Sequence, residues 1–114
     1  MIRAKRVYDK PEHSDGSRIL VDRLWPRGLS KERAKIDVWL KDVAPSNGLR
    51  KWFAHNPKKW AEFKKRYFKE LGGKKDLIEF ILNTEKQGAV SLLYGARDEK
   101  FNNAIALKSY IERK

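Results

Sequence analysis

Two short stretches of this sequence combine arginine, aspartate and aromatic residues directly after segments that are predicted to be strands. The first is Asp22-Arg23-Leu24-Trp25-Pro26-Arg27-Gly28, which follows an apolar run. An arginine side chain can hold a phosphate or carboxylate through two parallel hydrogen bonds, and ligand crevices lie beyond the carboxyl ends of parallel strands. The stretch therefore predicts an anion-binding loop. The structural alternative is that Trp25 anchors the core, Asp22 pairs with Arg23, and Arg27 and Gly28 turn the chain.

The second stretch, Tyr94-Gly95-Ala96-Arg97-Asp98, leaves the most apolar predicted strand and leads into the last predicted helix. A glycine allows the backbone to approach a ligand closely, and free amides at the start of a helix favour an anion. Asn102 and Asn103, in the first turn of that helix, would add hydrogen-bond donors. The structural alternative is that Gly95 turns the chain, Asp98 caps the helix, and the two asparagines satisfy local backbone groups.

We predict that these two stretches form one small pocket for a phosphate- or carboxylate-bearing ligand. The arginines would bind the anion and the aromatic side chains would form a wall, whereas the two aspartates would orient the arginines or act as acid or base. The sequence supports both a binding domain and an enzyme with this site. The predicted ligand-binding residues are Arg23, Trp25, Arg27, Tyr94, Arg97 and Asn103, and the candidate catalytic residues are Asp22 and Asp98.

The sequence argues against several other kinds of site. It contains no cysteine, which excludes disulfides, a thiol nucleophile and thiolate metal ligands. Its two histidines, His13 and His55, have no paired ligand spacing, so we expect no metal. No P-loop, dinucleotide-binding glycine pattern or G-x-S-x-G nucleophile motif is present, and we expect no cofactor.

The balance of charge suggests a second function. Twenty-seven lysines and arginines face 15 acidic residues, giving a net charge of +12. Such a charge attracts nucleic acid or phosphorylated metabolites, although abundant surface charge is also typical of thermophilic proteins. The predicted helix 56–71 is lysine-rich, but Trp60, Phe63 and Tyr67 lie on the stripe opposite most of its lysines and are expected in the core. A nucleic-acid-binding module without sequence preference is therefore the alternative function.

A third alternative is an accessory interaction domain without a small ligand, in which Trp25, Trp39 and Trp52 build the core. The chain of 114 residues is the size of one domain. It has no window of about 20 apolar residues and no signal-peptide pattern, so we expect a cytoplasmic protein without a membrane partner.

The pattern of apolar and turn residues predicts a small single-domain α/β fold with a short, mostly parallel sheet, in the order β-β-α-α-α-β-α. Between the second strand and the first long helix we expect a short helix over 31–34 and an extended or irregular piece over 36–43. The expected strands are residues 2–8, 18–24 and 89–94, and the expected longer helices are residues 47–54, 57–71, 74–86 and 101–113.

Several stretches spread along the chain carry a family resemblance, including Val21 to Lys31, Ala44 to Ser46, Leu49 to Phe53, Leu92 to Asp98, and Asn102 to Ala104. Through them the chain resembles the domain of unknown function 488 family, and within it the YeaO-like branch. The resemblance implies a compact α/β fold in which the two predicted site stretches face one another, and it implies no particular activity. A related branch carries cysteine and histidine where this sequence has Tyr94, Asn102 and Asn103, so thiol or imidazole chemistry is not expected here.

Overall fold

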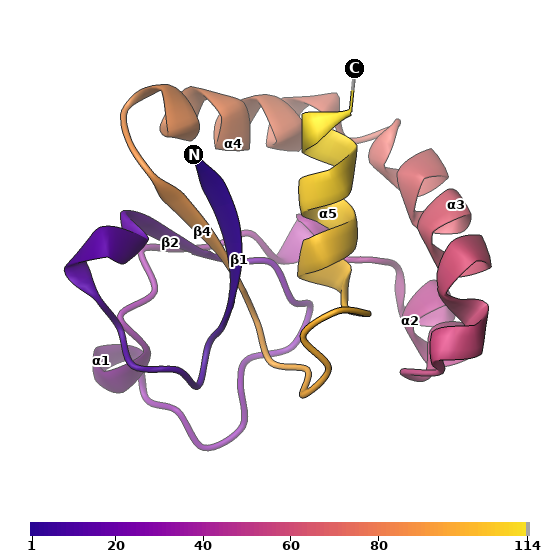
Figure 1. Ribbon diagram of the computed structural model, residues 1–114, viewed down its shortest axis with the longest axis horizontal. Coiled ribbons are helices and arrows are strands. Elements are labelled where there is room, and N and C mark those ends of the chain that lie inside the picture. Colours follow the sequence, from indigo (N-terminus) through magenta and orange to yellow (C-terminus); the bar gives the residue numbers. More distant parts are fainter. Residues whose placement is uncertain (114) are drawn as a thin grey trace.

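The computed structural model describes residues 1–113 and contains four strands, five α-helices and three short 3-10 helices within that range (Figure 1). The predicted α/β fold with a parallel sheet is confirmed. In chain order the elements are β1 (Ile2–Arg6), η1 (His13–Asp15), β2 (Ser17–Leu20), α1 (Lys31–Ala34), β3 (Val38–Trp39), η2 (Lys41–Val43), α2 (Asn47–Phe53), η3 (Pro57–Lys59), α3 (Trp60–Leu71), α4 (Lys75–Lys86), β4 (Val90–Tyr94) and α5 (Asn103–Glu112).

The four strands form one sheet in the order β1-β4-β2-β3, and every pair is parallel. The last strand in sequence, β4, lies between β1 and β2, and all five of its residues are buried. Parallel strands require long crossover connections, which here carry the helices. Because all four strands run the same way, their carboxyl ends meet at one edge of the sheet.

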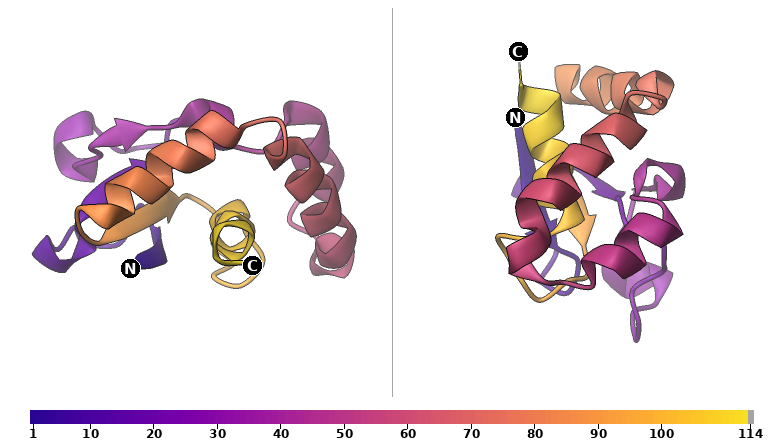
Figure 2. Two further views of the ribbon diagram at one scale, coloured as in Figure 1. Left: turned by 90° about the horizontal axis from the view of Figure 1, so that it is seen from above. Right: turned by 90° about the vertical axis from the view of Figure 1, so that its right-hand side faces the viewer.

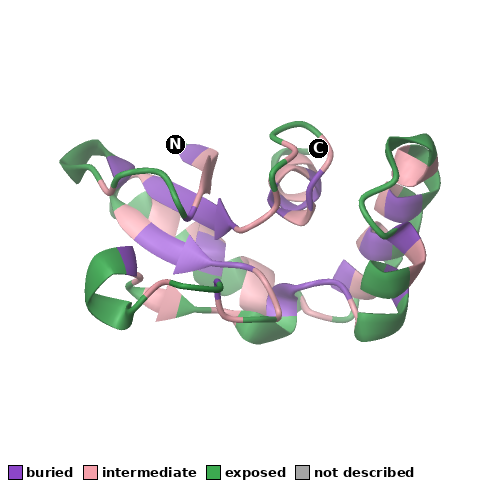
Figure 3. Ribbon diagram, turned by 90° about the horizontal axis from the view of Figure 1, so that it is seen from below, coloured by how far each residue is buried: buried purple, intermediate pink, exposed green. Residues whose placement is uncertain are grey.

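The two faces of the sheet pack against different parts of the chain because successive side chains of a strand point to opposite faces. On one face, Ile19, Val90 and Leu92 join a large core formed with helices α2 to α5. On the other face, Leu20 and Leu93 form a smaller cluster, covered by α1 and the loop after β2. The two central strands are thus buried on both sides, as the colouring of β2 and β4 shows (Figure 3).

The loop between β1 and β2 is fixed by a buried ion cluster. The Asp15 carboxylate is fully buried and accepts hydrogen bonds from Lys5 Nζ at 2.8 Å and from an Arg18 guanidinium nitrogen at 2.6 Å. Arg18 also donates to the carbonyl oxygen of Ala34 at 2.8 Å. At Gly16, whose φ is +66°, a Cβ atom would overlap the carbonyl oxygen of Ala89, so only glycine fits. This cluster anchors the crossover that places β2 beside β4.

Helices α2 and α3 form a pair beside the sheet. Ser46 caps α2 by accepting a hydrogen bond from the Leu49 amide, and its own amide and hydroxyl donate to Glu70 of α3. Helix α3 also packs against α5 (Figure 2). Phe63 and Tyr67 of α3 are buried, as predicted from their stripe. The pair is therefore held at a fixed position next to the carboxyl edge of the sheet.

The structure differs from the predicted elements at several boundaries. The second strand ends at Leu20, whereas the prediction extended it to Leu24, and the first ends at Arg6 rather than at Tyr8. The region predicted as extended or irregular contains β3 and η2, so the sheet has a fourth strand that the predicted order lacked. The predicted helix 57–71 is divided into η3 and α3.

Candidate functional site

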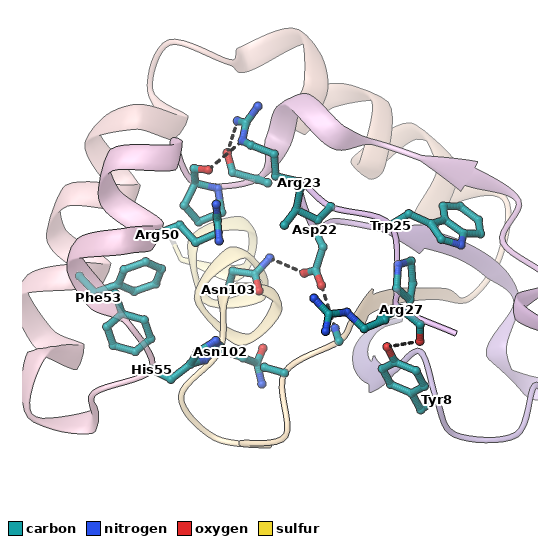
Figure 4. Close-up of a pocket in the computed structure, with 17 residues that line it drawn as sticks. Tyr8, Asp22, Arg23, Trp25, Arg27, Arg50, Phe53, His55, Asn102 and Asn103 are labelled. Atoms are coloured by element: carbon teal, nitrogen blue, oxygen red, sulfur yellow. Dashed lines mark hydrogen bonds between the residues drawn. The ribbon is translucent and has the colours of Figure 1, made fainter. Parts of the chain in front are cut away.

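A cleft of about 550 Å³ lies at the carboxyl edge of the sheet, between the segments that follow β1, β2 and β4 on one side and α2 on the other (Figure 4). This is the edge at which parallel α/β sheets bind ligands. The cleft is lined by Tyr8, Asp22, Arg23, Leu24, Trp25, Pro26, Arg27, Ala44, Pro45, Arg50, Phe53, His55, Phe63, Gly95, Ala96, Asn102 and Asn103.

The Asp22 carboxylate lies at the centre of the cleft and is held by two donors. Its Oδ2 accepts a hydrogen bond from the Gly95 amide at 2.8 Å, and its Oδ1 accepts one from Asn103 Nδ2 at 3.0 Å. Burial raises the pKa of Asp22 although these hydrogen bonds oppose the shift. Within residues 1–113, no lysine, arginine or histidine forms an ion pair with it. The carboxylate therefore keeps acceptor capacity for a ligand.

Two neighbours of Asp22 are positioned by adjoining elements: Gly95 by the end of β4, and Asn103 by the start of α5. A Cβ atom at Gly95 would lie 3.3 Å from Asp22 Oδ2, so the glycine permits the close approach of this strand end to the carboxylate. Asn102 caps α5 by accepting from the Ile105 amide at 2.9 Å, which leaves Asn103 in the first turn facing Asp22. Asn103 Nδ2 also donates to the carbonyl oxygen of Val21 at 3.0 Å. Helix α5 is thereby joined to the end of β2.

Three arginines line the cleft, and they are held to different degrees. Arg23 is half-buried and donates to the carbonyl oxygens of Pro45 and Ala44 at 3.2 and 3.3 Å. Arg27 and Arg50 are exposed, and their side chains point into the cleft from opposite sides (Figure 4). Arg27 makes no side-chain hydrogen bond to residues 1–113. Arg50 donates only one side-chain hydrogen bond within residues 1–113, to Asn47 Oδ1 at 3.4 Å, so both guanidinium groups keep donors for an anionic ligand.

The remaining wall is aromatic. Phe53 and Phe63 stack with ring centroids 4.3 Å apart, and the His55 ring lies 6.3 Å from Phe53. His55 has a φ of +57°, a backbone conformation rare outside glycine and asparagine, and it follows the left-handed Ala54 that ends α2. This turn places the imidazole at the mouth of the cleft. On the opposite side the Tyr8 hydroxyl donates to the carbonyl oxygen of Arg27 at 2.9 Å, which ties the end of β1 to the arginine loop.

The structure brings together five of the eight residues predicted for the site. The other three lie elsewhere. Tyr94 is buried in the core, where burial raises its pKa. Arg97 and Asp98 line a separate depression of about 430 Å³ that adjoins the cleft at His55. The five that line the cleft are Asp22, Arg23, Trp25, Arg27 and Asn103.

Parts of the structural alternatives are wrong. Asp22 does not pair with Arg23, because the Arg23 guanidinium is bound to backbone carbonyl groups. Asp98 does not cap α5. Instead its Oδ1 accepts from the amides of Lys100 and Phe101 in the preceding turn, and these bonds lower its pKa. Trp39 is 37% exposed, so it does not simply build the core.

Sequence reasoning missed Arg50, Phe53 and His55, which come from α2 and the turn after it. Their stretch lies on a predicted helix rather than after a predicted strand, so only the packing of α2 beside the sheet brings it to the cleft. The available signal was the family resemblance, which includes Leu49 to Phe53. Among residues 1–113, no three histidine, aspartate or glutamate side chains lie close enough together to hold a metal ion. The cleft presents arginine guanidinium groups, one carboxylate, amides, the His55 imidazole and other aromatic rings.

The whole chain, residues 1–114, matches the model of the inactive DUF488-N3 subclade. The chain belongs to the DUF488 family. The resemblance recognised in the site stretches is thereby confirmed. The DUF488 chain is 40% identical over 110 residues to the Uncharacterized protein YeaO of Escherichia coli (strain K12), covering 96% of each chain. It is 45% identical over 78 residues to the Uncharacterized protein Rv3073c of Mycobacterium tuberculosis (strain ATCC 25618 / H37Rv), covering 68% of this chain and 66% of the relative.

No solved structure matches this DUF488 protein. In the part of the chain that the structure describes, no helix has the length and apolar character needed to cross a membrane. The site stretches that carry the family resemblance are the same stretches that contribute Asp22, Arg27 and Asn103 to the cleft. The cleft is thus lined in part by the stretches on which the resemblance was based.

Proposed function

We propose that this protein binds, in the cleft, a small ligand that carries both an anionic group and hydrogen-bond donors. The observation that carries the proposal is the convergence of Arg27 and Arg50 from opposite sides on a cleft whose centre is the Asp22 carboxylate (Figure 4). A cleft of about 550 Å³ has the size of ordinary small-molecule sites.

The charges divide the cleft into two parts. An anion near Asp22 would be repelled, so the anionic group of the ligand belongs beside the arginines. The free acceptor positions of Asp22 instead favour amino, amide or hydroxyl groups. A bare phosphate or carboxylate ion would satisfy only the arginines. The ligand class is therefore a phosphate or carboxylate attached to a polar organic group.

Binding is favoured over catalysis. The two candidate catalytic residues do not share a site, because Asp22 lies in the cleft and Asp98 lies in the adjoining depression. The subclade to which the chain belongs is described as inactive. The accessory-domain alternative requires the same arginine and aspartate side chains to pair with each other and close the site, whereas Arg27 remains exposed beside an open cleft.

A thermal-shift panel tests the proposal. It compares inorganic phosphate with nucleotides, sugar phosphates, amino acids and hydroxy acids, at low and moderate salt. A ligand at 100 times its Kd stabilises the native state by about 2.7 kcal/mol, which for a domain of this size is a rise in Tm of roughly 10 °C. The shift should be largest for ligands with both groups and should be lost in the Arg27→Gln/Arg50→Gln variant.

The matched control is Lys10→Gln/Lys86→Gln, which removes two exposed positive charges that do not line the cleft. It should retain the full shift. If the cleft variant and this control respond to the best ligand alike, the ligand is not bound by the arginines and the proposal is wrong.

A further inference from the structure

Most of the net charge of the chain lies in one segment of the sequence, which begins in the wall of the cleft. Between residues 50 and 75 there are ten lysines and arginines and two glutamates, a net +8 of the chain's +12. We call residues 50–75 the basic segment. It begins at Arg50 in the cleft wall and continues through the turn of His55, η3 and α3. The remaining 88 residues carry a net charge of only +4, so a general abundance of charged residues does not explain this uneven distribution of charge along the chain.

The two glutamates of the basic segment are already engaged. Glu62 forms an ion pair with Arg66 at 2.8 Å, and Glu70 accepts hydrogen bonds from Ser46. Lys51 and Lys58, which flank the turn of His55, are exposed and make no side-chain hydrogen bond or ion pair within residues 1–113. The positive charges of Lys51 and Lys58, which follow Arg50 along the chain, are therefore not neutralised within residues 1–113.

Aromatic side chains accompany this charge. The Trp52 ring, half-buried on α2, is covered by the Arg66 guanidinium at 4.3 Å and by Lys59 Nζ at 4.9 Å. These cation–π contacts keep cationic groups at fixed positions on the surface of the α2–α3 pair. Within the cleft, Tyr8, at 41% exposure, and His55 offer ring surfaces at the mouth. Basic grooves with aromatic side chains are the pattern of single-stranded nucleic-acid sites.

We propose that the cleft and the basic segment together bind a single-stranded nucleic acid, with one nucleotide in the cleft and the phosphates of its neighbours on Lys51 and Lys58. The inference rests on the proposed function, because it identifies the anion and the donor-bearing group as parts of one nucleotide. The phosphate contacts Arg27 and Arg50, and the amino or imino groups of the base donate to Asp22. A duplex is disfavoured because its bases are stacked and paired and cannot enter the cleft.

The test measures binding of labelled six-nucleotide DNA and RNA single strands by fluorescence anisotropy, and of nucleoside monophosphates by competition. The proposal expects each hexanucleotide to bind at least about tenfold more tightly than its monophosphate, because neighbouring phosphates add contacts. A matched hairpin duplex should bind more weakly than the single strand of equal charge.

Two double variants separate the parts of the surface. Lys51→Gln/Lys58→Gln should weaken hexanucleotide binding, leave monophosphate binding unchanged, and reduce the slope of log K against log salt by about 1.4, since each single-strand phosphate contributes about 0.7. Arg27→Gln/Arg50→Gln should weaken the binding of both the hexanucleotide and the monophosphate. Lys10→Gln/Lys86→Gln removes the same charge elsewhere and should change neither beyond the general effect of net charge. Circular dichroism and the urea midpoint confirm that each variant is folded.

The outcomes distinguish the two proposals. If the hexanucleotide binds no better than the monophosphate, or if only a non-nucleotide anion binds in the cleft, the strand-binding inference is wrong and the proposed function stands. If hexanucleotide, polyphosphate and polyglutamate bind alike and the cleft variant matches the Lys10→Gln/Lys86→Gln control, binding is a general effect of charge and both proposals fail. Equal binding of duplex and single strand also overturns the inference.

Discussion

The hydrogen bond between Asn103 and Asp22 joins α5 to the end of β2 at the centre of the cleft, and a double-mutant cycle measures it. Asn103 Nδ2 donates to the Asp22 carboxylate and to the Val21 carbonyl oxygen, each at 3.0 Å. A hydrogen bond to a charged group contributes about 1.5–3 kcal/mol and one to a neutral group about 0.5–1.5 kcal/mol. Because both side chains are half-buried, water can replace part of each lost hydrogen bond. Asn103→Ala should therefore lower the free energy of unfolding by about 2 kcal/mol.

For a domain of about this size, 2 kcal/mol corresponds to a fall in Tm of roughly 8 °C. The cycle compares Asn103→Ala, Asp22→Ala and the double variant by urea unfolding at pH 7, followed by circular dichroism. The coupling energy should be about 1.5 kcal/mol and should weaken as the pH falls through the raised pKa of Asp22, because a neutral carboxyl group is a weaker acceptor.

Asn83→Ala is a suitable control, because Asn83 is exposed on α4 and makes no side-chain hydrogen bond within residues 1–113, so its effect should stay within about 0.5 kcal/mol. A coupling energy below about 0.5 kcal/mol at pH 7 is within the error of additivity. That result would show that the two side chains do not act as a unit, and the account of a preformed centre to the cleft would be refuted.

Four further predictions concern stability and pH. Burial raises the pKa of Asp22 in the folded protein, so ionisation of this carboxyl group destabilises the native state at pH values above its ordinary pKa of 3.8. The free energy of unfolding of Asp22→Asn, measured by urea titration, should therefore increase relative to that of the parent as the pH rises above 3.8. Protonation of Asp22 should make sulfate, whose charge is constant over this range, bind more tightly at low pH because repulsion is removed, while donor-bearing ligands bind less tightly. Equal pH profiles for the two ligands would contradict the division of the cleft. Asp15→Ala should cost about 3–5 kcal/mol, because it leaves the Arg18 guanidinium buried without its counter-charge, and chemical denaturation checks this. Tyr67→Phe should cost about 1–3 kcal/mol, because it leaves the Val43 carbonyl oxygen, accepting at 2.7 Å, without its buried donor; an unchanged unfolding midpoint would count against this bond.

The long periodic segments of the sequence predict their elements well, because their burial is decided locally. The apolar run of β4 and the stripe of α4 are recovered to within one residue. The two-residue strand β3 was not resolved as a strand, since two residues are too few to show alternation and its existence depends on pairing with β2. The second strand was predicted too long because Leu24 continues its apolar pattern, although this side chain is 61% exposed in the loop that lines the cleft.

Only those residues of the candidate site that directly follow a strand could be predicted from the sequence. Asp22 and Arg27 were predicted because they follow a parallel strand, whose carboxyl end must lie beside that of β4. Arg97 was predicted by the same reasoning, but the turn closed by Asp98 carries it into the adjoining depression. Arg50 belongs to a helix far along the chain, and its place in the cleft depends on tertiary packing that no local pattern encodes.

The central position of β4 also determines when this sheet can assemble during synthesis. β1 and β2 are not neighbours in the sheet, and each pairs with residues 90–94. Both strands therefore leave the ribosome with unpaired edges and remain so until most of the chain has been translated. Contacts of such sequence separation fold slowly and leave strand edges open to intermolecular pairing. The β2–β3 pair and the helices α1 to α4 are complete before β4 is made, whereas the cleft can close around Asp22 only after that final strand has been inserted.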